Sequence, residues 1–569
     1  MKERKRRDFT REPTLAASAS KGGKGSSRLF LLFAICFSVL LLTIGLSHIR
    51  LYEVFHPVLL SAWPITESRL IFTDPSNPYP YSRNSNPTYI KVNHAVLLPD
   101  EIVLVTNHHS LLSIPNPDLL KCQYTPPASS HSSRHSLSAK AKLNLPPLSL
   151  STSLVRCPLG PPGFSLSLST SPHSRHRPFQ WDHLAYSALF DPLDNSTVVF
   201  AKGFNLRSAR ISDPARYRCV FRRDLSNPKY IITSPVITAA QEIFRCKTPL
   251  TVLNSYRKKL DMPLVSVKTK DRGAIALPSV ARPEILKRYR RNHKKKKKHS
   301  MCICTMVRNQ ARFLREWIMY HSRVGVQRWL IYDNNSEDKI EQAVNSLGQS
   351  NYNITLHPWP WIKTQEAGFA HCALRARAEC EWVGFIDVDE FFYFPYGLTI
   401  RDVLKNYSNQ PWVGELRTDC HNFGPSGHKK APENGVTTGY TCRMLAPERH
   451  KSIIRPEALN KSLINVVHHF HLREGMRSVN VGQGVMLINH YKYQAWEVFK
   501  EKFKRRVATY VADWQDEENV GSKDRAPGLG TKPVEPPDWP YRFCELNDTG
   551  LRDWVIKEFK DPQTGELSW

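Results

Sequence analysis

The hydrophobic positions in the second half of the chain alternate between short apolar runs and longer stretches with helical spacing. The runs that predict strands are Met301–Val307, Arg328–Tyr332, Tyr352–His357 and Trp382–Ile386. Between them, residues 310–323, 337–347 and 365–380 have the spacing of helices. Strands that alternate with helices form a parallel sheet with helices on its faces, and such sheets bind ligands at the carboxyl ends of their strands. We therefore expect an α/β domain over residues 300–569 with a mostly parallel sheet.

Residues 81–260 show a different pattern, typical of a β-rich domain. Short apolar runs in 88–125 and 186–250 are separated by Pro and Gly, as in a small β-sandwich. Residues 126–180 are dense in Ser, Pro and His, which bury little apolar surface, so we expect a disordered insertion there. Residues 261–299 contain five consecutive lysines and predict an exposed basic linker to the α/β domain.

An uncharged apolar run fills residues 29–47. As a helix it would span about 28 Å, close to the roughly 30 Å hydrocarbon core of a bilayer, so we predict a transmembrane helix over 29–49. A cleaved signal peptide is the alternative, but the run is longer than usual for one and no small-residue cleavage site follows it. The basic tail 1–28 predicts a cytosolic N-terminus, and a stem over 50–80 then leads into a lumenal remainder.

The net charge of +29 changes this picture little. Lys and Arg gather in the tail and the linker without an RNA-recognition, helix-turn-helix or zinc-finger pattern, so we expect no nucleic-acid partner. Of the twelve cysteines, eleven follow the predicted membrane helix, where a lumenal location permits disulfides. An odd number leaves at least one unpaired, and the sequence does not fix the pairing.

Asp387-Val388-Asp389 is the strongest local signal of chemistry, because it follows the last of the four predicted strands. A nucleotide-sugar carries a diphosphate whose charge must be neutralised before it leaves, and carboxylate-bound Mn²⁺ or Mg²⁺ does this as a Lewis acid. One aspartate can reach the ribose while the other meets the metal, or both can approach the ion, so Asp387 is a candidate for both roles. The alternative is a phosphohydrolase with an aspartyl nucleophile. In that pattern Thr or Val follows the second aspartate, whereas this chain has Glu390 there.

Asp333 and Arg308 follow two other predicted strands and are candidate donor-binding residues. A carboxylate at Asp333 can accept hydrogen bonds from ribose hydroxyls or the uracil imide; the alternative is a helix N-cap. Arg308 can meet phosphate or base edges, and the alternative is a surface cation.

Several further motifs occur in a fixed order between residues 300 and 520. They include Val307-Arg-Asn, Tyr332-Asp-Asn-Asn-Ser336, Phe385-Ile-Asp-Val-Asp-Glu-Phe391, Phe423-Gly-Pro-Ser-Gly-His428, His450-Lys-Ser-Ile-Ile-Arg-Pro456, Val467-His-His-Phe-His471 and Ile488-Asn-His-Tyr491. With these motifs the chain resembles the family 92 glycosyltransferases, most of all their plant branch, which is similar to pectic β-1,4-galactan synthases.

The resemblance implies a GT-A-like, Rossmann-related fold, UDP-galactose as the donor, Mn²⁺ (or Mg²⁺) as the cofactor, and inversion at the anomeric carbon. It also implies a glycan acceptor such as a cell-wall β-galactan, and the β-rich region resembles the carbohydrate-binding-like domain of that branch. Together with the membrane helix, it indicates a single-pass type II protein of the Golgi membrane, with a homodimer left open. The alternative is a catalytically inactive lumenal protein that binds glycans or acts as a scaffold.

An inverting transfer needs a general base that takes the proton of the acceptor hydroxyl. We expect this base after the metal motif, where the candidates are Asp419, which we prefer, Glu415 and Glu448. His490 is a candidate third metal ligand, with a core histidine as the alternative. Lys451 and Arg455 are candidates for neutralising phosphate or contacting acceptor hydroxyls.

Overall fold

The computed structural model describes residues 298–502 and 534–569 in full and residues 90–286 with short gaps. The gaps are 91, 109–119, 127–135, 150–151, 170, 177, 205, 207–210, 223–230, 258–261 and 272–273. The predicted cytosolic tail, membrane helix and stem therefore lie outside the described residues. Within the described part of the chain, no helix is long and apolar enough to cross a membrane.

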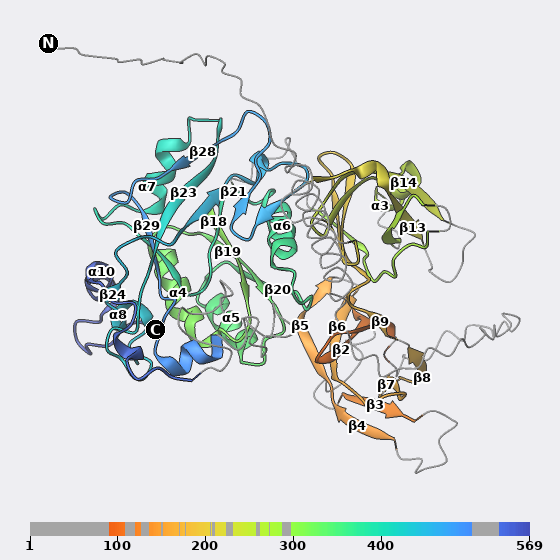
Figure 1. Ribbon diagram of the computed structural model, residues 1–569, viewed down its shortest axis with the longest axis horizontal. Coiled ribbons are helices and arrows are strands. Elements are labelled where there is room, and N and C mark those ends of the chain that lie inside the picture. Colours follow the sequence, from red (N-terminus) through yellow and green to blue (C-terminus); the bar gives the residue numbers. More distant parts are fainter. Residues whose placement is uncertain are drawn as a thin grey trace, which may run out of the picture. The chain divides into compact units, whose positions relative to one another are not determined.

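The α/β domain is built around a nine-stranded sheet (Figure 1). Its strands are β18 (His299–Val307), β19 (Arg328–Asp333), β20 (Ile354–Pro358), β21 (Cys380–Phe385), β22 (Glu390–Tyr393), β23 (Val413–Asn422), β25 (Arg449–Ile454), β28 (Arg477–Asn480) and β29 (Leu487–His490). Their order is β20-β19-β18-β21-β25-β23-β29-β22, and β28 pairs with β23.

Only part of this sheet is parallel. Strands β18 to β21 run parallel, as predicted. In contrast, β25 is antiparallel to β21 and β23, and β22 is antiparallel to β29. The expectation of a mostly parallel sheet is therefore wrong, and the sheet is mixed. Antiparallel neighbours need no crossover helix, so the strand–helix alternation that predicts parallel pairing ends after β21.

Three helices cover the parallel half of the sheet: α4 (Ala311–Arg323), α5 (Ile340–Gln349) and α6 (Gln365–Ala376). They agree with the three predicted helices to within a few residues. Alternate residues of β18 explain their placement, because Met301 and Ile303 pack in one core with α4 and α5, whereas Cys302 and Cys304 pack in another core with α6. A disulfide joins Cys304 to Cys372 of α6, and another joins Cys302 to Cys380 of β21.

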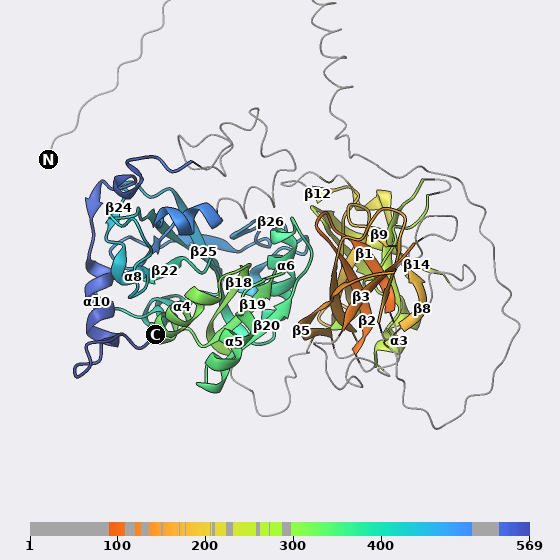
Figure 2. The ribbon, with the colours of Figure 1, turned by 90° about the horizontal axis from the view of Figure 1, so that it is seen from below.

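Residues 90–286 form three further sheets (Figure 2). Their strands are β1 (Val92–Leu97), β2 (Glu101–Asn107), β3 (Lys121–Thr125), β4 (Leu137–Lys140), β5 (Lys142–Ser149), β6 (Thr152–Pro158), β7 (Ser165–Leu168), β8 (Ser171–His176), β9 (Phe179–Gln180), β10 (Ala185–Asp191), β11 (Ser196–Ala201), β12 (Ile211–Ser212), β13 (Tyr217–Arg222), β14 (Ile232–Ala240), β15 (Ile243–Lys247), β16 (Leu264–Thr269) and β17 (Pro283–Ile285). The strand orders are β5-β6-β2-β1-β9, β4-β3-β7-β8 and β16-β13-β14-β15-β11-β10-β17, with β12 beside β14.

Two expectations about this region are wrong. Where the structure describes the Ser- and Pro-rich residues 126–180, they are not a disordered insertion, because they supply β4 to β9. Their central strand β6 is hydrogen-bonded to β2 and β5, and Cys157 within it forms a disulfide with Cys122. The predicted linker 261–299 also contains two strands, since β16 pairs with β13 and β17 pairs with β10, while its residues 287–297 lie outside the described part of the chain.

The β-rich region and the α/β domain share a hydrophobic core within one compact unit. Trp181 stacks on Trp361 with 5.5 Å between ring centroids, and Tyr186 meets Trp359 edge-on at 6.1 Å. Trp359 and Trp361, which the α/β domain contributes to these contacts, are fully buried. The β-rich region is therefore packed on the α/β domain through large aromatic side chains rather than merely tethered to it.

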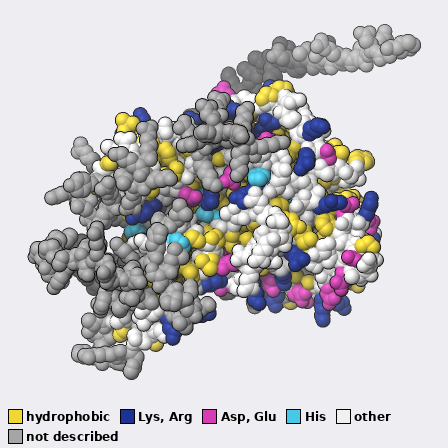
Figure 3. All heavy atoms as spheres, turned by 180° about the vertical axis from the view of Figure 1, so that it is seen from behind, with side chains coloured by type: hydrophobic (Ala, Val, Ile, Leu, Met, Phe, Trp, Pro, Cys, Tyr) yellow, Lys and Arg dark blue, Asp and Glu magenta, His cyan; other side chains and the backbone are white. Residues whose placement is uncertain are grey.

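Charges of both signs are present on the face of the molecule in Figure 3. Dark blue Lys and Arg side chains are interspersed there with magenta Asp and Glu. The prediction that the protein has no nucleic-acid partner stays a prediction.

Candidate active site

The predicted metal motif lies in the tight connection between β21 and β22. Asp387 and Asp389 fall in a turn rather than on the strand itself, and Val388 between them is buried in the core. The backbone N–H of Asp387 donates to Glu390 Oε2 (3.0 Å), and the N–H of Glu390 donates to the carbonyl of Asp387 (3.0 Å). A buried valine and a bracing glutamate thus hold both aspartates just beyond the carboxyl end of β21.

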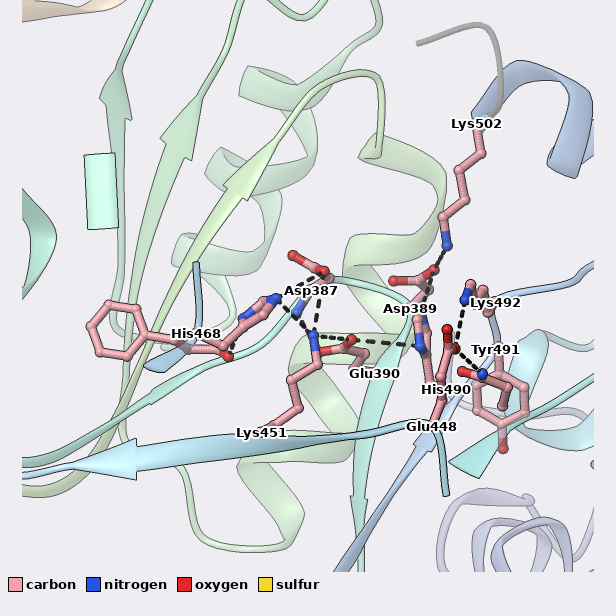
Figure 4. Close-up of polar contacts among 12 residues, drawn as sticks. Asp387, Asp389, Glu390, Glu448, Lys451, His468, His490, Tyr491, Lys492 and Lys502 are labelled. Carbon is pink, nitrogen blue, oxygen red and sulfur yellow. Dashed lines mark hydrogen bonds and ion pairs between the residues drawn. The ribbon is translucent and has the colours of Figure 1, made fainter. Parts of the chain in front are cut away.

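The motif belongs to a row of alternating charges, which Figure 4 shows. Lys451 Nζ lies 2.6 Å from Glu390 Oε1 and 3.9 Å from Asp387 Oδ2. His468 Nε2 lies 2.7 Å from Lys451 Nζ and 3.7 Å from Asp387 Oδ2. One buried lysine therefore joins two carboxylates and an imidazole on this side of the motif.

His490 joins the other side of the motif. Its Nε2 atom is 3.5 Å from Asp389 Oδ2, and its Nδ1 atom is 3.7 Å from Glu390 Oε1 (Figure 4). The Lys502 ammonium also contacts Asp389. The structure thus brings together four residues that sequence reasoning selected, namely Asp387, Asp389, Lys451 and His490.

Sequence reasoning missed three members of this cluster. Glu390 and His468 had signals, since one directly follows the metal motif and the other belongs to the motif Val467-His-His-Phe-His471. Lys502 had none, because a lysine twelve residues beyond His490 is indistinguishable in the sequence from a solvated one. Only the folded chain places its ammonium on Asp389.

Burial and neighbouring charges set the protonation states in this cluster. Burial opposes ionisation of Asp389, but Lys502 and His490 outweigh it and hold its pKa well below the usual value. Burial lowers the pKa of His490 to about 4, although Asp389 opposes this shift. Burial also raises the pKa of Glu390 to about 7, against the effect of Lys451. At neutral pH, Asp389 is therefore an anion and His490 a neutral imidazole.

The donor atoms fit a hard divalent cation. Asp389 supplies an anionic oxygen, neutral His490 supplies a nitrogen lone pair, and Asp387 adds a second carboxylate whose side chain is 31% exposed. Carboxylate and imidazole groups are suitable ligands for Mn²⁺, and Mg²⁺ prefers the oxygens. The Lys502 ammonium on Asp389 shows that a positive charge is favoured at this carboxylate.

Asp333 and Arg308 lie at the same edge of the sheet as the metal motif. Asp333 ends β19 and is paired in register with Val307, the residue before Arg308. Asp333 is buried, and its Oδ1 accepts a hydrogen bond from the N–H of Ser336 at 3.0 Å. Burial raises its pKa, which the hydrogen bonds from Ser336 oppose. Asp333 is therefore not the N-cap of α5, because that position is Lys339 and has no side-chain cap; the Asp333 carboxylate instead accepts within the turn that precedes the helix.

The β-rich region braces this turn, which the sequence did not indicate. Arg156 of β6 donates through Nε to Glu101 Oε2 (2.7 Å) and through Nη2 to Glu337 Oε1 (2.5 Å). Asn335 Nδ2 donates to the other oxygen of Glu101 at 3.0 Å. Lys142 Nζ donates to the carbonyl of Ser336 at 2.6 Å. Three consecutive residues of the candidate donor-binding turn, Asn335, Ser336 and Glu337, are therefore held by charged side chains of β2, β5 and β6.

The three candidate bases have different surroundings. Glu415 is fully buried and accepts hydrogen bonds from Ser452 (2.5 Å), Ser478 and Arg417 (2.9 Å). Burial opposes its ionisation, but hydrogen bonds, first among them that of His469, lower its pKa to about 2. So weak a base with every oxygen engaged fits a structural role better than proton transfer.

Strand alternation separates Asp419 from the cluster around the metal motif. On β23, Thr418 is paired with Lys451, and Asn422 with His490, so even-numbered residues share the face of the cluster. Asp419 faces the other side, where Gln483 donates to it at 2.6 Å. Glu448 instead accepts from Asn422 and from Lys492 (2.6 Å), beside His490 in Figure 4.

Arg455 lies apart from the other candidates. Its guanidinium stacks over the Trp382 ring at 4.4 Å and donates to the carbonyl of Tyr407 at 2.7 Å. These contacts hold the end of β25 against neighbouring elements. The structure therefore does not place Arg455 beside Lys451 in the cluster around Asp387 and Asp389.

The carboxylate–imidazole cluster lies at the strand ends of an α/β sheet, which is where sheets of this class bind their ligands. Residues 297–520 match the model of glycosyltransferase family 92. Two proteins called glycosyltransferase family 92 protein, from Oryza sativa subsp. japonica and Ricinus communis, are 57% and 51% identical to this chain. The alignments cover 95% and 91% of this chain and 93% of each relative. The chain belongs to glycosyltransferase family 92, as its motifs predicted, and this membership supports a glycosyl transfer activity.

Solved structures are more distant. A mannosyltransferase from Pyrobaculum calidifontis in complex with GDP-Man and Mn²⁺ is 15% identical, over 41% of this chain and 67% of that chain, with a TM-score of 0.23. So low an overlap carries no argument about the site, and the assignment rests on the relatives.

Proposed function

We propose that this protein transfers a hexose, with galactose as the first choice, from a UDP-sugar to a glycan acceptor such as a cell-wall β-galactan, with inversion. The observation that carries the proposal is the cluster of Asp387, Asp389 and neutral His490 just beyond β21. These three residues would hold Mn²⁺ (or Mg²⁺), which supplies Lewis-acid neutralisation of the diphosphate when bound. A GT-A-like fold remains part of this proposal.

The neighbouring side chains have roles that follow from their places. Asp333, at the end of β19, accepts hydrogen bonds from the ribose or the uracil, and Arg308 beside it contacts phosphate. Lys451 is buried, and although burial lowers its pKa, Glu390 and Asp387 outweigh burial and raise it. Lys451 is therefore a fixed cation beside the leaving diphosphate, where a preorganised charge stabilises the charge that develops in the transition state.

We assign the general base to Glu448, although the sequence favoured Asp419. Glu448 adjoins the cluster through Asn422, whereas Asp419 points from the opposite face of β23. Lys492 and Asn422 orient the Glu448 carboxylate, and although burial opposes ionisation, they hold its pKa below the usual value. Glu448 is then an anion at neutral pH and can accept a proton from an acceptor hydroxyl.

The test is UDP release by the purified protein with a panel of UDP-sugars and a galactan acceptor. We expect release that requires acceptor and Mn²⁺, is fastest with UDP-galactose, and falls to background when both Asp387→Ala and Asp389→Ala are present. Asp553→Ala is the matched control, since its side chain is 56% exposed on α10 (Gly550–Phe559). Release by the double variant at the wild-type rate would show that the metal-site assignment is wrong.

The same experiment addresses the alternative function. Binding of glycan without turnover of any donor would favour a glycan-binding or scaffold protein. The proposed Golgi location and type II orientation rest on residues 1–80, so they need fractionation of cells and protease protection of the lumenal domain. Gel filtration with light scattering would decide between a monomer and the homodimer.

A further inference from the structure

A second group of ligand-type atoms lies directly behind the metal motif. Glu390, Cys420 and His490 each offer one ligand atom, and these atoms all lie within 4.8 Å of one another. The three residues come from neighbouring strands of one sheet. Glu390 is paired with His490 across β22 and β29, and Cys420 is paired with Ile488, two residues before His490. Their side chains therefore leave the sheet from the same face.

Cys420 differs from every other described cysteine. The ten others form five disulfides, whereas Cys420 is a free thiol within the described part of the chain. Only 3% of its surface is exposed, and Glu390 beside it is fully buried. A thiol, a carboxylate and an imidazole are thus gathered where water has little access.

The imidazole of His490 faces two directions. Its Nε2 atom points to Asp389 at 3.5 Å, on the side of the cation proposed above. Its Nδ1 atom points to Glu390 Oε1 at 3.7 Å, and Glu390 in turn has a ligand atom within 4.8 Å of Cys420 Sγ. Within the described part of the chain, Glu390 Oε1 has no hydrogen-bond partner of good geometry, and the Lys451 ammonium lies 2.6 Å from it. One ring therefore separates an oxygen-rich site from a sulfur-containing one.

We propose that Glu390, Cys420 and His490 form a second cation site, for a thiophilic divalent ion such as Zn²⁺, distinct from the site of Asp387 and Asp389. Thiolate, imidazole and carboxylate are the ligands that zinc prefers, whereas Mn²⁺ and Mg²⁺ prefer oxygen. Three protein ligands leave one coordination position open. Ligands bound to zinc at about 2.0–2.3 Å lie roughly 3.3–3.8 Å apart, so the side chains would close by about an ångström.

Binding has two local consequences. The Cys420 thiol loses its proton to solvent as the metal–sulfur bond forms. Lys451 gives up its contact with Glu390 but retains His468 at 2.7 Å and Asp387 at 3.9 Å. Because both sites use one imidazole, we expect Zn²⁺ at the inner site to weaken Mn²⁺ binding at the outer site. This last step rests on the proposed function, whereas the inner site does not.

The test is titration of the metal-free, full-length protein with Co²⁺, which reports a thiolate ligand by charge-transfer absorption in the near ultraviolet. We expect one equivalent to bind with this absorption in the wild type and in Asp387→Ala, and no such absorption in Cys420→Ser. Cys420→Ser should retain Mn²⁺ binding, followed by electron paramagnetic resonance. X-ray absorption of the wild type with Co²⁺ should show one sulfur neighbour, which keeps the test independent of how the variant folds.

The inner site is overturned if the wild type shows no sulfur–cobalt signal, or if Cys420→Ser shows the same absorption as the wild type. The shared-ring coupling is overturned if one equivalent of Zn²⁺ leaves the Mn²⁺ affinity of the wild type unchanged; we expect it to fall about tenfold or more, as when a supporting partner of a metal ligand is lost. Failure of Mn²⁺-dependent UDP release would contradict the proposed function alone.

Discussion

Replacing Arg156 tests whether the β-rich region is a working part of the transferase. Arg156 links Glu101 and Glu337, at 2.7 Å and 2.5 Å, and its side chain is 8% exposed. At 2.7 Å and an effective dielectric constant near 20, the gross attraction is about 6 kcal/mol per pair. Desolvation cancels part of this, and removing one partner of a buried pair costs about 3–5 kcal/mol. Glu337 is 57% exposed and can rehydrate, so we expect Arg156→Ala to lose about 3 kcal/mol of unfolding free energy.

The assay is guanidinium unfolding followed by tryptophan fluorescence and circular dichroism. Arg323→Ala is the matched control, because Arg323 is 59% exposed and pairs with Glu558 at 2.5 Å, so it should lose only about 0–1 kcal/mol. Arg156→Lys should recover part of the loss, since a lysine keeps the charge but not the two-pronged contact. Because the bridge fixes the turn after Asp333, we also expect a higher KM for the UDP-sugar. Equal losses of stability in Arg156→Ala and Arg323→Ala would refute this reasoning.

Three further predictions concern the α/β domain. Burial lowers the pKa of His321 to about 3, below the 6.5 of an unperturbed histidine, so the unfolded chain binds the proton first as the pH falls. The free energy of unfolding that neutral His321 contributes is therefore lost between about pH 6.5 and pH 3, and the loss reaches about 2 kcal/mol at pH 5. Between pH 7 and pH 5, the free energy of unfolding measured for His321→Gln should therefore fall by about 2 kcal/mol less than that of the wild type. Glu448→Gln should lower kcat about a hundredfold or more at unchanged Mn²⁺ affinity, whereas Asp419→Asn should not, and the reverse result would return the base to Asp419. Replacing Cys304 and Cys372 together with serine should cost about 2–4 kcal/mol in denaturant unfolding of the oxidised protein, and an unchanged midpoint would show that this bond is dispensable.

Local pattern was enough to predict the first half of the α/β domain. The four strands and three helices between His299 and Phe385 lie where the alternation of apolar runs and helical spacing places them. The pairing of β23 with β25 and β29 was not predictable in the same way. These strands are neighbours in the sheet but are separated along the chain, so no local spacing of residues indicates that they pair.

Composition misled in the β-rich region. Residues 126–180 contain too little apolar surface to predict a fold on their own. They fold because β2 supplies hydrogen-bond partners to β6, and because the Cys122–Cys157 disulfide ties β6 to the adjacent sheet. A segment of this kind is stabilised by partners outside itself, which its own composition does not reveal.

By itself, the sequence determined the family, and it predicted the metal motif and the edge of the sheet at which the motif lies. These depend on residues close together in the chain, such as Asp387 and Asp389 after an apolar strand. Only the tertiary structure decided that Lys451, His468, His490 and Lys502 converge on that motif, and that Glu415 is held away from it by its own hydrogen bonds. The reason is physical: protonation and ligand geometry depend on burial and on charges within a few ångströms, and those neighbours are brought together by strand pairing across a hundred residues of chain.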